Sequence, residues 1–153
     1  MKARDVDAGL NGSPTGCHAE QIQAASNAGK AIMCEKPVSL SVDQIHETLK
    51  VVEKNKSTLM IGFNRRFDPN FAELESRIRK GAIGAVELVT VISRDPSPPP
   101  AEYVKGSGGL FRDMMIHDFD MARFLMGEEL VVVNALGSAL VDKAIGEAGD
   151  VET

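Results

Sequence analysis

Three short apolar segments, each followed by a polar turn and then an amphipathic stretch, constrain the fold of this chain more than any other feature. The segments are residues 6–10, 31–34 and 58–62. Apolar runs of strand length that alternate with helical patterns are typical of βαβ units, which place parallel strands side by side in one sheet. The sequence therefore predicts an α/β fold whose first part contains a parallel sheet.

Local signals mark the helices that should follow these strands. A helix is expected from about residue 16 to Gly29, with Thr15 as its cap. Residues 41–44 have the pattern of a capping box, in which two side chains satisfy backbone amides at a helix start. A third helix is expected over residues 69–80, ending before Gly81.

The pattern changes near residue 66, where we place a domain boundary. Residues 1–66 would form the first part and residues 67–153 the second. The second part predicts the start of an α+β domain, because β-branched segments there flank one long helical pattern. In chain order its elements are a strand over 86–93, a Pro/Ser/Gly-rich loop over 95–109, a helix over 110–126 and a strand-like run over 130–140.

Composition excludes several classes of function. The chain has 153 residues, of which 43% are apolar and 25% charged, as in ordinary globular proteins. A formal net charge of -5 argues against a nucleic-acid partner, because such binding depends on clustered basic side chains. No apolar run approaches the roughly 18 residues that span a membrane, and the only cysteines, Cys17 and Cys34, lack metal-site spacing. We expect a soluble, cytoplasmic protein without a bound metal or membrane partner.

Polar clusters follow all three expected strands. They are residues 13–18, 35–37 and 64–66. Ligands of open parallel sheets bind outside the carboxyl ends of the strands, so three aligned clusters indicate a binding site. Each cluster taken alone is equally typical of a solvated turn between a strand and a helix.

Lys36 is the first candidate catalytic residue. It lies between Glu35 and Pro37, directly after the apolar run 31–34. A residue before proline is biased towards extended backbone, which gives the lysine side chain a defined direction and could hold its ammonium over a reacting oxygen. The alternative is a surface lysine in an ordinary turn.

Asp113, His117 and Asp120 supply a second candidate group. Their spacing of four and seven residues places them on one stripe of a regular helix. Histidine suits proton removal from an alcohol near neutral pH, and a carboxylate one turn away can orient its ring. The alternative is a solvent-facing charged stripe. Asp118 points towards the apolar side and should have a structural partner, such as an arginine or a backbone amide. Cys34 has no evident base nearby, which favours a buried structural thiol over a nucleophile.

Five ordered motifs carry a resemblance to a known family. They are Ser-Pro-Thr-x-x-His at 13–18, Cys-Glu-Lys-Pro at 34–37, Gly-Phe-Asn-Arg-Arg-Phe-Asp at 62–68, Ser-Arg-Asp-Pro at 93–96, and the Gly-Gly-Leu-Phe-Arg-Asp to His-Asp-Phe-Asp stretch at 108–120. In this order they resemble the Gfo/Idh/MocA oxidoreductases, and within that family most closely the inositol 2-dehydrogenases. The resemblance implies a partial Rossmann-type dinucleotide-binding domain followed by part of a substrate and oligomerisation domain.

The resemblance also implies a reaction, the NAD-dependent oxidation of a cyclic polyol such as myo-inositol to a keto-inositol. Lys36 would hydrogen-bond the reacting hydroxyl, His117 would remove its proton as general base, and Asp113 would hold the histidine. Arg66 and Asp120 would contact other hydroxyls of the polyol substrate. A homo-oligomer formed through the second-domain sheet is left open.

The cofactor implied by the resemblance is NAD, with NADP left open. Its nicotinamide-ribose side would be lined by five residues. These are Ser13, Pro14, His18, Glu35 and Pro37. In this family the Lys-Pro bond is commonly cis, so Pro37 would set the local geometry. His18 could instead serve only the first turn of its helix.

The chain also departs from the family pattern. It contains no Gly-x-Gly-x-x-Gly motif, which supplies backbone amides for the pyrophosphate. The family's first strands would lie before Met1, and the rest of its second domain after Thr153. Gly9 and Asn11 also occupy strand positions that usually carry β-branched residues. These departures predict a central fragment that by itself binds NAD weakly or not at all.

Three hypotheses remain open at this point. The chain is the catalytic part of an inositol dehydrogenase, or an inactive remnant that at most associates with intact homologues, or a polyol-binding module without redox chemistry. Tight NAD binding would exclude the second hypothesis, and inositol binding that needs no cofactor would favour the third.

Overall fold

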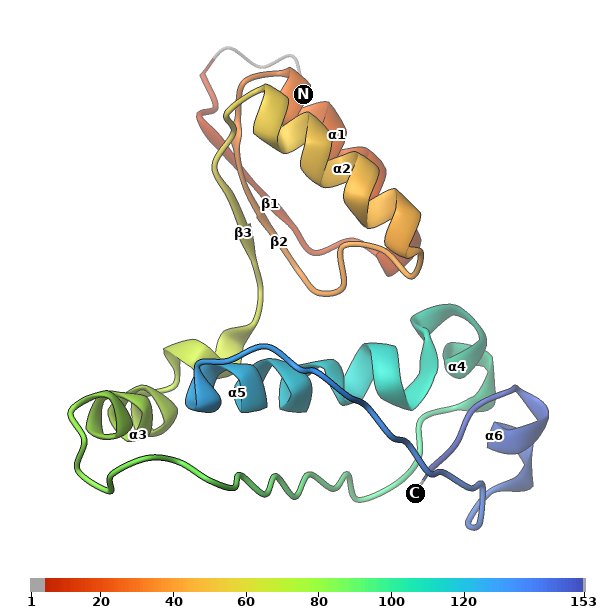
Figure 1. Ribbon diagram of the computed structural model, residues 1–153. Helices are drawn as coiled ribbons and strands as arrows, with labels where there is room; N and C mark the ends of the chain where they lie inside the picture. The colour runs from red at the N-terminus through yellow and green to blue at the C-terminus, as the bar shows by residue number, and fades with distance from the viewer. Residues whose placement is uncertain (1–4, 153) are drawn as a thin grey trace. The chain divides into compact units, whose positions relative to one another are not determined.

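The computed structural model describes residues 5–152. The chain forms two compact units, residues 1–62 and residues 63–153. Figure 1 shows that the first unit layers helices on a small sheet, whereas the second consists of helices joined by extended connections.

The first unit contains a parallel three-stranded sheet. Its strands are β1 (Ala8–Asn11), β2 (Ala31–Cys34) and β3 (Leu59–Ile61), in the spatial order β1-β2-β3. Both neighbouring pairs are parallel. Parallel neighbours need crossover connections, which are supplied by α1 (His18–Asn27) and α2 (Val42–Lys54). The α/β prediction and the three strands expected from the sequence are thereby confirmed, within one or two residues at each end.

The two helices cover one face of this sheet (Figure 1). The core between them and the strands centres on Ile22, Ala25, Ile32 and Cys34, all at most 4% exposed. Burial of a side chain such as Ile22 contributes about 1.5–3 kcal/mol to stability. This small core therefore fixes the sheet edge from which the candidate loops emerge.

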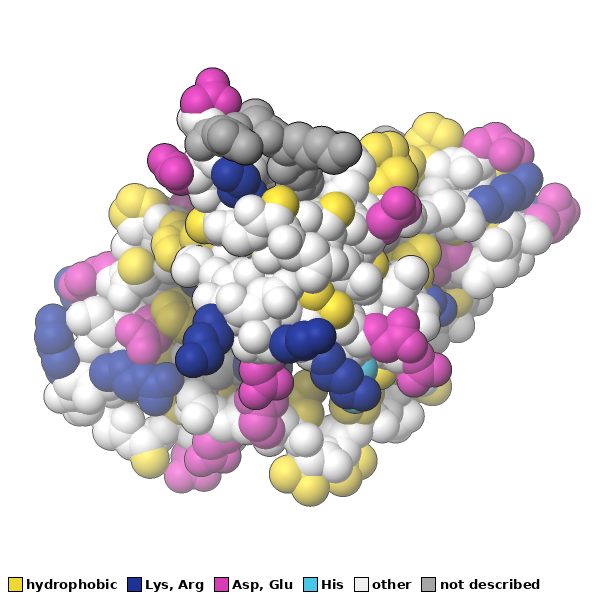
Figure 2. Space-filling model, turned by 90° about the horizontal axis from the view of Figure 1, so that it is seen from above, with side chains coloured by type: hydrophobic (Ala, Val, Ile, Leu, Met, Phe, Trp, Pro, Cys, Tyr) yellow, Lys and Arg dark blue, Asp and Glu magenta, His cyan; other side chains and the backbone are white. Residues whose placement is uncertain are grey.

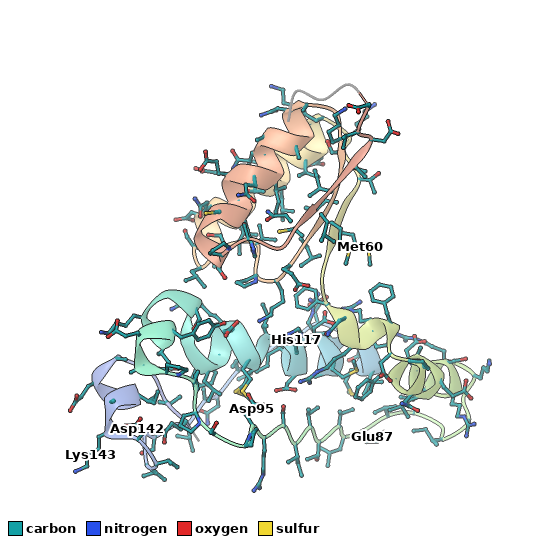
Figure 3. All side chains as sticks on the ribbon, turned by 180° about the vertical axis from the view of Figure 1, so that it is seen from behind. Met60, Glu87, Asp95, His117, Asp142 and Lys143 are labelled. Atoms are coloured by element: carbon teal, nitrogen blue, oxygen red, sulfur yellow. The ribbon has the colours of Figure 1, made fainter. Side chains whose placement is uncertain are left out.

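The opposite face of the sheet carries apolar side chains that remain exposed. Leu10 pairs with Met33, and Met33 pairs with Met60, so the three form one row across the strands. They are 79%, 39% and 39% exposed, respectively. Figure 3 shows Met60 projecting from β3 on the side away from the helices. Alternating strand residues therefore separate a packed face from an open one.

The capping box predicted at the start of α2 is only half formed. Ser41 Oγ accepts a hydrogen bond from the Gln44 backbone amide at 3.4 Å. The Gln44 side chain does not reach back to Ser41, because its Oε1 accepts a bond from the Ser39 hydroxyl. Ser39 Oγ in turn accepts from the Ser41 amide at 3.1 Å. A neighbouring serine thus replaces the second half of the box.

The prediction that Thr15 caps the first helix is wrong. A 3₁₀ turn over Thr15–Cys17 precedes α1, and neither it nor α1 has a side-chain cap. The Cys17 amide instead donates to the carbonyl oxygen of Pro14 at 2.9 Å. A backbone carbonyl oxygen in this turn thus accepts from an amide near the helix start that would otherwise need a side-chain cap.

The second unit contains helical segments of several types. They are a 3₁₀ turn η2 (Asn64–Phe67), α3 (Pro69–Arg79), α4 (Ala101–Ser107), a π-helix η3 (Leu110–Met114), α5 (Ile116–Met126) and α6 (Lys143–Glu147). Asp68 caps α3 by accepting a hydrogen bond from the Asn70 amide at 2.8 Å, and Gly81 follows its end at φ 76°. The predicted helix over 69–80 is confirmed.

Three predictions for the second unit need correction. Residues 86–93 and 130–140 are not paired as strands, and the expected loop over 95–109 contains the helix α4. A strand exists only when a neighbour accepts and donates its backbone hydrogen bonds, and the described residues provide no such neighbour. Both segments run as extended connections in Figure 1. The sequence therefore identified extended conformation but not its pairing.

Charges of both signs are mixed on the surface. On the face drawn in Figure 2, lysine and arginine side chains lie among aspartate and glutamate side chains. Among residues 5–152, no helix has the length and apolar character needed to cross a membrane.

Candidate functional site

Two of the predicted polar clusters emerge from the same edge of the first unit's sheet. The cluster at residues 13–18 follows β1, and the cluster at 35–37 follows β2. Because the strands are parallel, both clusters lie at their carboxyl ends, where ligands of open α/β sheets bind. The structure thus places these two clusters at one site.

His18 ties the two loops together. Its Nδ1 lies 2.7 Å from the carbonyl oxygen of Pro37, and its Nε2 lies 2.7 Å from the carbonyl oxygen of Ser13. The side chain is only 1% exposed. The ring therefore acts as a cross-brace between the loops, a role that sequence reasoning missed because the Pro37 contact spans 19 residues.

The Lys36-Pro37 peptide bond is cis, as the family resemblance implied. Lys36 is half-buried. The backbone around it is anchored at two places, because the Glu35 amide donates to the carbonyl oxygen of Asn11 at 2.9 Å and the Gly62 amide donates to that of Cys34 at 2.8 Å. The loop that carries the candidate lysine is thus held by both neighbouring strand ends.

Gly62 lies close to the carboxylate of Glu35. A Cβ atom at this position would lie 3.0 Å from Glu35 Oε2, closer than side chains normally pack. The glycine therefore leaves room for the carboxylate beside the third strand end. Nothing in the local sequence pattern signals this contact, which joins residues 27 positions apart.

Asn11 shapes the first loop and is not a defect of its strand. Its Oδ1 accepts hydrogen bonds from the Ser13 amide at 3.2 Å and from the Ser13 hydroxyl at 2.8 Å. The Ser13 hydroxyl also lies 3.0 Å from Gln21 Oε1. Asn11, at the end of β1, thus forms an Asx-turn. In such a turn the asparagine side chain accepts a hydrogen bond from the backbone amide two residues later.

Cys34 is a buried structural thiol, as expected. Burial, reinforced by the negative charge of Glu35, raises the pKa of Cys34 to about 11. Its Sγ donates to the carbonyl oxygen of Glu35 at 3.2 Å. The thiol therefore stays protonated at neutral pH and is a poor nucleophile.

Asp113 and His117 belong to the second unit and lie on different helical segments. Asp113 lies on the π-helix η3. His117, labelled in Figure 3, lies near the start of α5. The expectation of one regular helix over 110–126 is wrong, because the Met115 amide donates to the carbonyl oxygen of Leu110, five residues back, at 2.8 Å. Such a π-turn shifts the side chains before it relative to those after it, and π-turns are frequent at functional sites.

Aromatic side chains flank this pair. The Tyr103 hydroxyl donates a hydrogen bond to Asp113 Oδ2 at 2.8 Å. The ring of Phe63 meets the ring of His117 edge to face, with centroids 6.4 Å apart and planes at 84°. Sequence reasoning missed both residues, although Tyr103 lies ten positions before Asp113.

Two neighbouring arginines bind two aspartates of α5. Arg65 pairs with Asp118, which confirms the expected structural partner of Asp118. Arg66 binds Asp120 through two hydrogen bonds of 2.7 and 2.6 Å. The bonds to Asp120 raise the pKa of Arg66. These two contacts fix the 3₁₀ turn η2 against α5.

The expected substrate contacts of Arg66 and Asp120 stay a prediction. In the structure these two side chains form hydrogen bonds with each other. Asp120 is only 5% exposed. The Arg66 guanidinium also lies 5.1 Å from the ring centroid of Phe124. Lys36 belongs to the first unit and His117 to the second, so their joint action is a prediction as well.

Family models match both units. Residues 1–63 match the model described as "Oxidoreductase family, NAD-binding Rossmann fold". Residues 71–153 match the GFO/IDH/MocA C-terminal domain. The two matches occur in the order in which the units follow each other in the chain.

Curated relatives extend these matches. The chain is 56% identical over 151 residues to the inositol 2-dehydrogenase of Rhizobium meliloti, covering 99% of this chain and 46% of the relative. It is 48% identical over 149 residues to the myo-inositol 2-dehydrogenase of Thermotoga maritima, covering 97% and 45%. The chain thus spans less than half the length of these relatives.

Solved structures agree with the sequence matches. A myo-inositol dehydrogenase from Corynebacterium glutamicum is 42% identical with a TM-score of 0.90, over 97% of this chain and 44% of that one. The scyllo-inositol dehydrogenase of Lactobacillus casei, solved with NAD(H) and scyllo-inositol, is 36% identical with a TM-score of 0.86, over 98% and 46%. From the family models, the relatives and the fold together, the chain belongs to the GFO/IDH/MocA oxidoreductase family.

Proposed function

We propose that this chain carries the catalytic residues of an NAD-dependent polyol dehydrogenase, with myo-inositol as the first candidate substrate. The observation that carries the proposal is the similarity to an inositol 2-dehydrogenase at 56% identity over 99% of the chain. The chain covers 46% of that relative. The proposal therefore concerns the chemistry of the residues present here.

The residues at the first unit's sheet edge fit one side of a dinucleotide. Ser13, Pro14, His18, Glu35 and Pro37 would hold the nicotinamide-ribose end. The exposed Glu35 carboxylate is an acceptor suited to ribose hydroxyls, and the His18 brace holds the two loops at a fixed separation. The sequence has no glycine-rich turn for the pyrophosphate, so we expect weak binding of NAD by these residues alone.

Three side chains divide the work on the substrate. His117 takes the proton of the reacting hydroxyl, while Asp113 holds the ring and stabilises the imidazolium. Lys36 donates a hydrogen bond to the same oxygen and stabilises its developing negative charge. A bound NAD would supply the acceptor for the hydride of the ring carbon. The C–H electron pair and the O–H proton leave together, and the alcohol becomes a ketone.

Arg66 and Asp120 are proposed to contact further hydroxyls of the ring. Their mutual pairing supports the role of Arg66 in particular, because it holds the guanidinium in place as a donor. A planar guanidinium that already binds one carboxylate retains N–H groups for a second acceptor. Such contacts would orient the polyol without taking part in proton transfer.

Replacement of His117 gives the sharpest test of this function. His117→Gln should lower NADH production from myo-inositol by about 100-fold or more, because general-base catalysis contributes roughly 10²–10⁴. His46→Gln is the matched control, since His46 is exposed on α2. NADH is followed by its absorbance at 340 nm, with scyllo-inositol assayed in parallel. Lys36→Met, compared with the exposed Lys50→Met, tests the lysine in the same way.

Binding measurements separate this function from the alternatives. Calorimetry should detect NAD binding to the chain, weakened in the absence of a pyrophosphate turn. Equal activity of His117→Gln and His46→Gln would contradict the proposed catalytic role. Inositol binding without any NAD binding would favour a polyol-binding module, and binding of neither would favour an inactive remnant.

A further inference from the structure

Tyr103 contacts a candidate catalytic residue but has no part in the function proposed above. It lies on α4 and is the only tyrosine of a chain that has no tryptophan. Its hydroxyl donates to Asp113 Oδ2 at 2.8 Å. One of the two carboxylate oxygens of Asp113 is thereby committed to Tyr103.

A tight turn brings the two side chains together. Helix α4 ends at Ser107, and Gly108 and Gly109 follow with φ values of 95° and 71°. The Gly109 amide donates to Ser107 Oγ at 3.3 Å. Two consecutive residues in left-handed backbone reverse the chain, so that η3 begins directly beside α4.

Asp150 fixes the other side of this turn. Its Oδ2 accepts a hydrogen bond from the Leu110 amide, the first of η3, at 2.8 Å. A Cβ atom at Gly109 would overlap the Asp150 carboxylate, so a side chain there would displace Asp150 besides straining the backbone. A carboxylate 40 residues further along the chain thus holds the start of the segment that carries Asp113.

The Tyr103 hydroxyl can act only as a donor to Asp113. The hydrogen bond to the carboxylate, together with partial burial and the carboxylate's charge, raises the pKa of Tyr103. The phenol is thus the donor and Asp113 Oδ2 the acceptor of this bond. A carboxylate held at one oxygen cannot rotate freely about its terminal torsion, which is otherwise broad.

We propose that Tyr103 is a positioning residue that fixes the plane of the Asp113 carboxylate, so that Oδ1 serves the His117 imidazole. This inference rests on the roles proposed above for Asp113 and His117. Tyr103 touches neither reacting atom in this scheme. It acts on the histidine only through the aspartate.

The same contact would also serve a purely structural purpose, the attachment of α4 to η3. The two explanations differ in what they require of His117. An oriented carboxylate selects one neutral tautomer of the ring, because the hydrogen bond at one nitrogen decides which nitrogen keeps the proton. A structural tie alone leaves the tautomer unaffected.

The first experiment checks the contact itself by spectrophotometric titration. With one tyrosine and no tryptophan, the absorbance change near 295 nm reports Tyr103 alone. The titration midpoint should fall when Asp113→Asn removes the charge. The double variant Tyr103→Phe/Phe67→Tyr supplies a reference phenol at a position that is 65% exposed. A Tyr103 midpoint no higher than this reference would overturn the contact.

The second experiment reads the tautomer of His117 by ¹⁵N NMR of the histidine rings. The full chain should show a single His117 tautomer, and Tyr103→Phe should give a mixture of both. Signals of His18 and His46 should not move, which serves as the internal control. The variant removes only a hydroxyl from a residue that is 53% exposed, so no buried cavity forms. An unchanged His117 tautomer in Tyr103→Phe overturns the inference.

Neither measurement needs cofactor or substrate. If the His117 tautomer responds to Tyr103→Phe but the chain never reduces NAD, the positioning inference stands and the proposed dehydrogenase function fails. If the chain is active and the tautomer does not respond, the reverse holds. Among active preparations, Tyr103→Phe should lower kcat while leaving the substrate KM close to that of the unaltered chain.

Discussion

The two cysteines differ sharply in their surroundings, and this difference governs their chemistry. Cys17 is exposed and Cys34 is buried. Burial and the charge of Glu35 raise the pKa of Cys34 to about 11. At pH 8 an alkylating reagent should therefore modify Cys17 and spare Cys34 until the chain unfolds, as peptide mass spectrometry can show.

The pH dependence of stability follows from the same shift. An unfolded cysteine has a pKa of about 8.5, so the unfolded chain loses this proton first as pH rises. The stability associated with Cys34 is fully present below that value and is lost as pH approaches about 11. Cys34→Ala should show a shallower decline of the urea midpoint between pH 8 and 10. An identical decline, or equal labelling of both thiols, would contradict this account.

Individual residues were predictable where their neighbours in sequence decide their role. The buried thiol of Cys34 and the need of Asp118 for a partner follow from the local apolar pattern, and the structure shows both. The sequence suggested that Asn11 weakens its strand. The structure shows instead that Asn11 stabilises the following turn through hydrogen bonds with Ser13, which strand propensity does not reveal. The role of Asp150 could not be predicted from the sequence pattern, because its contact with Leu110 spans 40 residues.

At the scale of elements, the turn between α4 and η3 depends on glycine. Gly109→Ala should destabilise the chain by about 1–3 kcal/mol, because it imposes left-handed backbone on a side chain that also collides with Asp150. Gly106→Ala is the matched control. Gly106 lies within α4 with open space around it, and alanine there should stabilise by about 0.5–1 kcal/mol.

Urea denaturation of the two alanine variants measures both effects. Asp150→Ala removes the collision but also the hydrogen bond to the Leu110 amide. The effect of Gly109→Ala is therefore measured with and without Asp150 in a double-mutant cycle, and the effect that persists in the Asp150→Ala background is the backbone strain. A Gly109→Ala chain as stable as the original would show that the turn tolerates a side chain.

The three strands of the sheet and the helices with local capping signals were predictable, whereas α4, the π-helix and the unpaired extended segments were not. Capping residues and apolar periodicity mark α2 and α3, and these signals are local. The sequence predicted extended conformation over 86–93 and 130–140 but not the lack of strand pairing there, because pairing depends on neighbours that the described residues do not supply. The π-helix was missed because a hydrogen bond between residues five apart does not change the apolar periodicity of so short a segment.

For the molecule as a whole, the second unit exposes an unusual amount of apolar surface. The side chains of Val131, Val132 and Val133 are 95%, 82% and 72% exposed. Leu136 and Leu140 follow at 90% and 75%. Extended apolar segments without strand partners favour association with other chains.

We therefore expect the isolated chain to bind an apolar dye and to self-associate at high concentration. Val131→Gln/Val133→Gln should reduce both effects, whereas Val42→Gln, at an isolated exposed position on α2, should change neither. Dye fluorescence and sedimentation velocity measure these outcomes. Equal association of all three proteins would show that this segment is not the source.

The contacts of His18 have a consequence for substitutions in the two loops that they join. The His18 imidazole contacts the main-chain oxygens of residues 13 and 37, so these contacts do not depend on the side chains at those two positions. A change of side chain at either position therefore leaves these two contacts available, provided that residue 18 stays a histidine.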